Sequence, residues 1–148
     1  MNEMLDKDTL GAIATEAAAA MFSLQLEPTT ESDADAMNRP GRHTVVLRLH
    51  GVPAIFLSLG CDREAGAEIA HTIFEVSVDQ TDDAMIDDAL RELANIFAGQ
   101  VKSMLAPDHE IGLPRVQHDA VALTAHDWHG VSMRIGASEQ CLDLAVAA

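Results

Sequence analysis

The residues best suited to chemistry lie in one helix-like segment, from Thr81 to Leu105. With a rotation of about 100° per residue, a narrow polar stripe of that helix contains Asp88, Glu92, Asn95, Gly99 and Lys102. Glu92 and Asn95 are three residues apart, so a carboxylate and a carboxamide point the same way, about one turn apart. Together they could grip a charged group and hold a water molecule, because an amide offers both a donor and an acceptor.

Gly99 on this stripe is a second sign of a binding surface. A glycine inside a helix costs about 1 kcal/mol relative to alanine, so on an exposed face it indicates that another molecule approaches closely. The opposite side of the segment is apolar and is predicted to be buried, with the residues Ile86, Leu90, Leu93, Phe97, Val101 and Met104. We therefore expect a helix with one buried face and one exposed polar stripe.

Composition limits the class of protein. A chain of 148 residues with 48% apolar residues predicts one domain, residues 1–148, with an aliphatic core, since it has only four Phe, one Trp and no Tyr. The net charge of −15 argues against nucleic acid and anionic membranes as partners. Two isolated cysteines, no apolar run of membrane-spanning length and an acidic N-terminal segment favour a cytoplasmic, reducing environment.

The segments around the stripe predict how it is positioned. Helices are expected over 3–24, 62–74 and 82–105, and strands over 43–50, 53–59, 116–125, 129–135 and 140–147, with a short edge strand near Leu26. The first two of these strands form a predicted hairpin with a tight turn at Gly51-Val52. Turns are also expected at Asp127-Trp128 and Gly136-Ala137, and Asp62 is expected to cap the second helix.

The two halves of the chain resemble each other weakly. Residues 8–14 align with 88–94 at an offset of 80, and residues 44–60 align with 120–136 at an offset of 76. The matches leave both an internal αββ duplication and coincidence open. At the positions equivalent to Glu92 and Asn95, the first half has Ala12 and Thr15. Two equivalent helices would thus carry a single polar pair, which implies one site per chain.

The spacing Asp88-x-x-x-Glu92-x-x-Asn95, followed by Ala98-Gly99, resembles the signature of the CheC/CheX/FliY phosphatases, which act on the phosphorylated chemotaxis regulator CheY. The single motif, the chain length and the order of elements are most similar to the CheX branch. This resemblance implies an α+β fold in a single domain, with three main helices and a mostly antiparallel sheet.

The resemblance also implies roles for individual residues. Asn95 would position the water that hydrolyses the aspartyl phosphate of a CheY-like receiver, and Glu92 would contact the receiver's active-site lysine. Asp88 would support the helix, Gly99 would let the receiver come near, and Lys102 could touch an acidic partner. Mg²⁺ would be supplied by the receiver, with no cofactor or metal of the chain's own. Relatives of the CheX type pair up, so we expect a homodimer.

Other functions remain open on the sequence. The chain could bind a receiver without turnover, as an adaptor in two-component signalling, or self-associate through the apolar strand from Glu139 to Val146. Without the resemblance, Glu92 and Asn95 would be a solvated helix face. His118, His126 and His129 lack zinc-ligand spacing and are predicted to be turn or surface residues.

Overall fold

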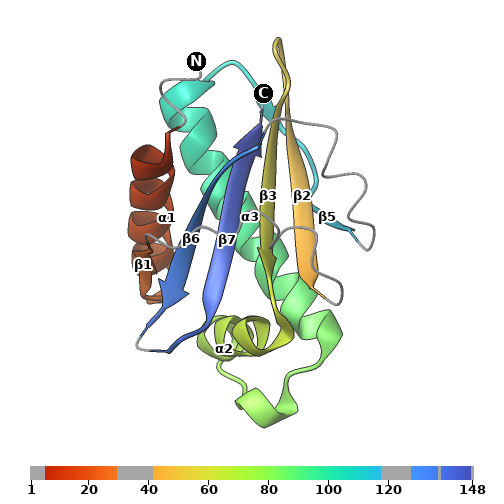
Figure 1. The fold of residues 1–148 in the computed structure, drawn as a ribbon. Coiled ribbons are helices and arrows are strands. Elements are labelled where there is room, and N and C mark those ends of the chain that lie inside the picture. The colour runs from red at the N-terminus through yellow and green to blue at the C-terminus, as the bar shows by residue number, and fades with distance from the viewer. Residues whose placement is uncertain (1–5, 30–41, 118–127, 137, 148) are drawn as a thin grey trace.

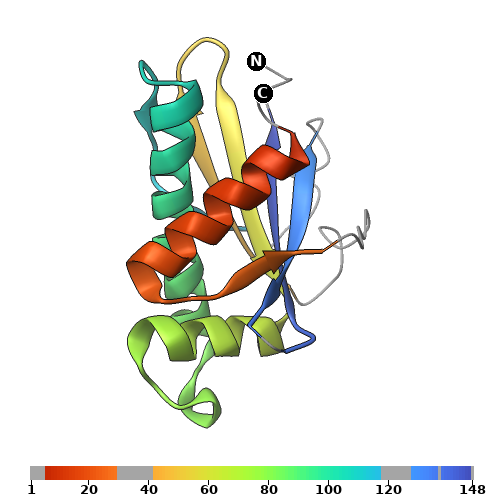
Figure 2. The ribbon, with the colours of Figure 1, turned by 90° about the vertical axis from the view of Figure 1, so that its left-hand side faces the viewer.

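The computed structural model describes residues 6–29, 42–117, 128–136 and 138–147. Its elements are α1 (Lys7–Phe22), β1 (Leu26–Pro28), β2 (His43–His50), β3 (Ile55–Cys61), α2 (Arg63–Phe74), η3 (Val78–Gln80), α3 (Asp83–Leu105), β4 (Glu110–Ile111), β5 (Arg115–Gln117), β6 (His129–Ile135) and β7 (Cys141–Ala147). Helices α1 and α3 lie on one face of the sheet, and α2 lies at one end of it (Figures 1 and 2). Among the helices that the structure describes, none combines the length and the hydropathy of a membrane-spanning segment.

The described strands form one antiparallel sheet in the order β1-β6-β7-β3-β2-β4, with β5 also paired to β2. The expected α+β class with a mostly antiparallel sheet is therefore confirmed. The central hairpin follows from period-two patterning, because Val45 and Leu47 are buried whereas Arg48 and His50 are exposed. Leu47 lies opposite Leu57 of β3, and both side chains enter the core beneath the helices.

The helices on the sheet begin in the same way. Asp6 accepts a hydrogen bond from the Thr9 backbone N–H at 2.8 Å, and Asp82 accepts one from Met85 N–H at 2.8 Å. Each side chain thus satisfies one of the free donors of a first helical turn. Helix α1 ends where Ser23 adopts a left-handed conformation with φ 56°, and its N–H bonds back to the last turn.

Most of the expected elements are present, with boundaries shifted by a few residues. The predicted helices, the hairpin and the edge strand near Leu26 are confirmed. Of the strand predicted over 116–125, the structure describes only β5, and residues 118–127 lie outside the described part. Asp62 occupies the cap position of α2, but its side chain makes no capping hydrogen bond and lies 3.8 Å from Arg42 Nη1 instead. The two-residue β4 and the short η3 were not predicted.

One predicted strand role is wrong. The strand expected over Glu139–Val146 was a candidate for pairing with a second chain, but β7 lies between β6 and β3. Its backbone groups are used on both sides, so no edge is available there. The internal duplication stays a prediction, because the segment equivalent to the first hairpin strand falls in residues 118–127.

The two cysteines are free, as the sequence favoured. Cys61 is buried at the end of β3, and this burial raises the pKa of its thiol to about 12. The thiol is therefore neutral at physiological pH and unreactive while the protein is folded.

Candidate functional site

Helix α3 is anchored by its buried face. Ile86, Leu90, Leu93, Phe97 and Val101 are all fully buried, as the sequence predicted. They pack on the sheet and on the neighbouring helices, together with the small residues Ala89, Ala94 and Ala98. Because the residues of this face recur every three or four positions, the opposite side of the helix must point outward.

Charged side chains fix the start of α3. His43, at the start of β2, lies with Nδ1 2.8 Å from Asp87 Oδ1 and with Nε2 3.3 Å from Asp83 Oδ1. Asp83 also accepts a hydrogen bond of 3.1 Å from Arg63 Nε of α2. The first turns of α3 are thus tied to both β2 and α2. His43 is a residue that sequence reasoning missed, because nothing local links positions 44 residues apart.

The other end of α3 is closed by Lys102. Its ammonium group donates a hydrogen bond of 2.8 Å to the carbonyl oxygen of Pro107, and the side chain is half-buried. A cation at this end also interacts favourably with the helix dipole. Lys102 therefore has a structural role in the chain, besides the partner contact that the sequence suggested.

The middle of the stripe is exposed. Glu92 and Asn95 are both exposed on α3, and neither has a hydrogen-bond or ion-pair partner among the described residues. Asp88 is occupied: its Oδ1 accepts a 2.6 Å hydrogen bond from Arg91 Nη1, three residues on. This pair holds Arg91 along the helix, and leaves the carboxylate of Glu92 and the amide of Asn95 free to meet another molecule.

Gly99 is half-buried, and a Cβ atom added there would meet nothing within 4 Å. The other helical glycines described differ. A Cβ at Gly66 would lie 2.4 Å from Ile86 Cγ2, and one at Gly11 would lie 3.0 Å from Pro28 Cγ. Internal packing thus explains Gly66 and Gly11, whereas nothing described in the chain requires glycine at position 99.

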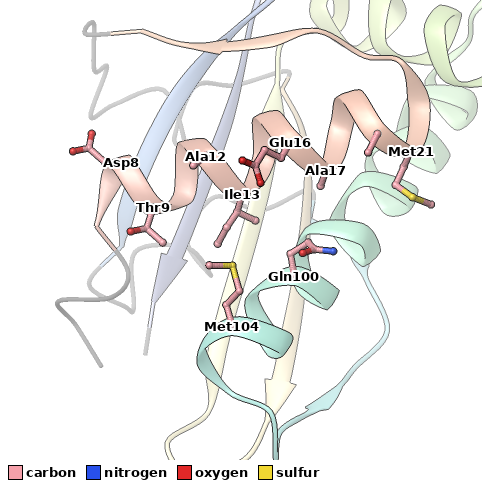
Figure 3. Close-up of a pocket in the computed structure, with 10 residues that line it drawn as sticks. Asp8, Thr9, Ala12, Ile13, Glu16, Ala17, Met21, Gln100 and Met104 are labelled. Atoms are coloured by element: carbon pink, nitrogen blue, oxygen red, sulfur yellow. The ribbon is translucent and has the colours of Figure 1, made fainter.

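One residue of the predicted buried face is misplaced. Met104 was expected in the core, but its side chain is 54% exposed and borders an open groove between α3 and α1. The cause is the arrangement of two helices: α1 faces this end of α3 across the groove rather than packing closely over it (Figure 3). No sequence pattern predicts the groove, because it depends on how two helices far apart in the sequence cross.

Metal-binding chemistry gains no support from the histidines. His129 is exposed at the start of β6, while His118 and His126 lie outside the described residues. Within the described part of the chain, no three His, Cys, Asp or Glu side chains gather closely enough to hold a metal ion.

Comparison with known proteins identifies the class. The family model described as chemotaxis phosphatase CheX matches residues 43–134, which include the whole of α3. The chain belongs to the CheX family. Comparison with curated protein sequences gives no match.

Solved structures show the same fold. Chemotaxis protein CheX from Vibrio vulnificus has a TM-score of 0.69 at 15% identity, over 95% of this chain and 93% of that one. CheX from Borrelia burgdorferi, solved in a complex with CheY, BeF3 and Mg²⁺, has a TM-score of 0.65 at 15% identity, covering 97% of each chain. FliY from Thermotoga maritima has a TM-score of 0.57 at 16% identity, over 96% of this chain and 89% of that one.

Proposed function

We propose that this protein hydrolyses the aspartyl phosphate of a CheY-like receiver domain, with Glu92 and Asn95 of α3 as the site. The observation that carries the proposal is their shared exposure: in a chain of the CheX family, both side chains project from a well-anchored helix with no partner among the described residues. The CheX from Borrelia burgdorferi was solved with CheY, which supports a receiver as the partner.

The reaction needs positioning more than proton transfer. An acyl phosphate dianion and one water give a carboxylate and dihydrogen phosphate, so the phosphorus–oxygen bond to the aspartyl group breaks and both protons of the water end on the phosphate. No base is required in that balance. An amide that accepts a hydrogen bond from the water and donates one to a phosphoryl oxygen can hold the water in line. Asn95 is suited to this task.

Glu92 has a different role in the proposal. Its carboxylate lies within one turn of Asn95 on the same face of α3. We assign it to the receiver's active-site lysine, because a lysine ammonium is the natural partner of an unpaired carboxylate. That contact would set the angle at which the receiver meets Asn95, while Asp88 stays with Arg91 and Gly99 lets the two surfaces close.

The metal in this scheme belongs to the receiver. Mg²⁺ in phosphoryl-transfer sites is held by one or two carboxylates together with phosphate oxygens and waters. On the stripe of α3, Glu92 is the carboxylate left over once Asp88 is paired with Arg91. Because Glu92 is assigned to the lysine, we propose that the receiver's own acidic residues bring the Mg²⁺.

The test is turnover. A CheY-like receiver is phosphorylated with acetyl phosphate and Mg²⁺, separated from the phosphodonor, and mixed with this protein at a hundredth of its concentration. We expect complete phosphate release, many times faster than the receiver's own decay. A non-catalytic adaptor at this ratio would bind at most a hundredth of the receiver, and the rest would decay at its own rate. That result would reject the phosphatase.

A homodimer is also part of the proposal, and the sheet limits which strand edges two copies could pair through. Because β7 is inside the sheet, the edges that the described strands leave for strand addition between two copies are β1 and the β4–β5 side. Analytical ultracentrifugation of the purified protein measures whether such a pair forms without a receiver.

A further inference from the structure

A groove of about 600 Å³ lies between α1 and the second half of α3 (Figure 3). Its base is apolar, with Ile13 and Ala17 from α1, and Met104 closes it from α3. Met21 stands at its far end and is 59% exposed, as Met104 is 54% exposed. Two flexible thioether side chains beside small residues suit a groove that fits itself around an incoming apolar group.

The rim of the groove is acidic. Asp8 and Glu16 of α1 line it, both are exposed, and neither forms an ion pair with a described residue. Among the described residues that line the groove, Gln100 is the polar one from α3 and none is a lysine or arginine. An occupant that places an apolar side chain in the groove and basic side chains at its rim would match this charge.

The groove lies on the flank of the helix that carries the proposed site. Gln100 is five residues from Asn95, about 7.5 Å along the helix axis and about 140° around it, so its side chain points toward α1 rather than along the stripe. A specific protein–protein interface buries about 800 Å² on each partner, which is far more than two side chains of one stripe can provide. A receiver seated on Glu92 and Asn95 therefore needs further contacts beyond the stripe, and a receiver wide enough to reach from α3 to α1 would cover the apolar groove between these two helices.

We propose that this groove is a second contact for the same receiver, and that it takes a large apolar side chain flanked by lysine or arginine. The inference rests on the proposed function, because the receiver is the partner proposed to bind Glu92 and Asn95 on α3. The groove would supply affinity and choice of receiver, while Asn95 supplies the rate.

The chain offers matched variants for the test. Ala12, Ala19 and Ala20 are all exposed on α1, but only Ala12 and Ala20 line the groove. Ala12→Trp and Ala20→Trp fill it, and Ala19→Trp adds the same bulk beside it. We expect the two groove variants to raise the KM for the phosphorylated receiver about tenfold with kcat within twofold of the parent, and the control to change neither.

Charge provides a second pair of variants. Glu16→Lys reverses the rim, and Asp79→Lys makes the same change in net charge on η3, outside the groove lining. Glu16→Lys is expected to raise KM severalfold more than Asp79→Lys at low salt, and the gap should shrink as salt is added. Equal effects of the two variants would overturn the assignment of a basic flank.

Failure of the inference differs from failure of the proposed function. If the parent protein turns over the receiver and all three tryptophan variants match it, the groove proposal is wrong and the phosphatase stands. If the parent shows no turnover, binding of the receiver loaded with beryllofluoride and Mg²⁺ is measured by calorimetry. Loss of affinity in Ala12→Trp and Ala20→Trp, with Ala19→Trp unchanged, supports the groove proposal. No binding by the parent overturns the groove proposal. Should those variants instead dissociate a dimer with KM unchanged, a second copy of this chain is the occupant.

Discussion

Helices α1 and α3 lie on the same face of the sheet and begin with equivalent aspartate caps, yet they present different surfaces. Helix α3 exposes Glu92 and Asn95, whereas α1 has Ala12 and Thr15 at the positions that the sequence alignment makes equivalent. Ala12 is exposed, and the Thr15 hydroxyl oxygen is buried without a hydrogen-bond partner among the described residues. One helix thus offers two free polar groups, and the other offers none at those positions.

Packing and chemistry are therefore separable in these two helices. Both helices keep an apolar face on the sheet, with Leu10 and Ile13 buried from α1 and Leu90 and Leu93 buried from α3. Only the outward positions diverge. The proposal that α3 carries the reaction while α1 forms a wall of the groove can therefore be tested by changing outward residues alone, with little risk to the core.

The largest effect is expected at Asn95. Asn95→Ala should lower kcat for phosphate release about 10²-fold, equal to about 2.7 kcal/mol of barrier, because the water loses the group that holds it in line. Thr15→Val is the matched change on α1 and should leave the rate within twofold. A phosphate-release assay on both variants, with circular dichroism to verify folding, decides the matter: an unchanged rate in Asn95→Ala removes the role assigned to α3.

A smaller effect, here a gain in stability, is expected from replacing the glycines of the two helices. Gly99→Ala should raise the free energy of unfolding by about 0.5–1 kcal/mol, since the added methyl meets no described atom and alanine favours the helix. Gly11→Ala on α1 should raise the free energy of unfolding by less, because the added Cβ would lie 3.0 Å from Pro28 Cγ. Urea denaturation measures both variants.

Gly99→Ala also tests the close approach of a partner. The same methyl that stabilises the helix should raise the KM for the phosphorylated receiver. A variant that is more stable and has an unchanged KM would show that glycine at this position has nothing to do with docking.

The smallest effect concerns the start of α1. Hydrogen bonds from the Thr9 backbone and side chain lower the pKa of Asp6 below its usual 3.8. A carboxyl whose pKa is lower in the folded state stabilises the helix above that usual value, and the contribution is lost as the pH falls through the folded pKa. The protection factor of the Thr9 amide, which corrects its exchange rate for the intrinsic pH dependence, should therefore fall as the protein is acidified below about pH 4. Asp6→Asn should flatten this dependence, and an unchanged acid response in that variant would place its origin elsewhere.

Much of the fold could be predicted because it depends on local periodicity. A few neighbouring residues are enough to predict the helix that contains Leu90, Leu93 and Phe97. The same is true of the hairpin that contains Val45 and Leu47. Short elements were missed for the same reason: β4 has two residues, too few for a pattern, and it exists only because β2 offers an edge to pair with. The position of β7 inside the sheet likewise depends on partners that are far away in the sequence.

The candidate site divides in the same way. That Glu92 and Asn95 share a face follows from helix geometry, and their exposure followed from the apolar residues opposite them. The contact of His43 with Asp87 and the exposure of Met104 could not be predicted, since each depends on how separate elements meet in three dimensions. The ammonium of Lys102 was expected on an exposed stripe, but the backbone beyond the helix turns back to meet it.

The place of β7 has a consequence for synthesis on the ribosome. Every other described strand, and all of α3, is made before residues 141–147, yet β6 and β3 become neighbours only through those seven residues. Until they emerge, the nascent chain holds two groups of strands with open edges, a state that is prone to aggregate. Helix α3 packs on β2 and β3, which are translated before it, so the surface that carries Glu92 and Asn95 does not depend on the last strand in the same way.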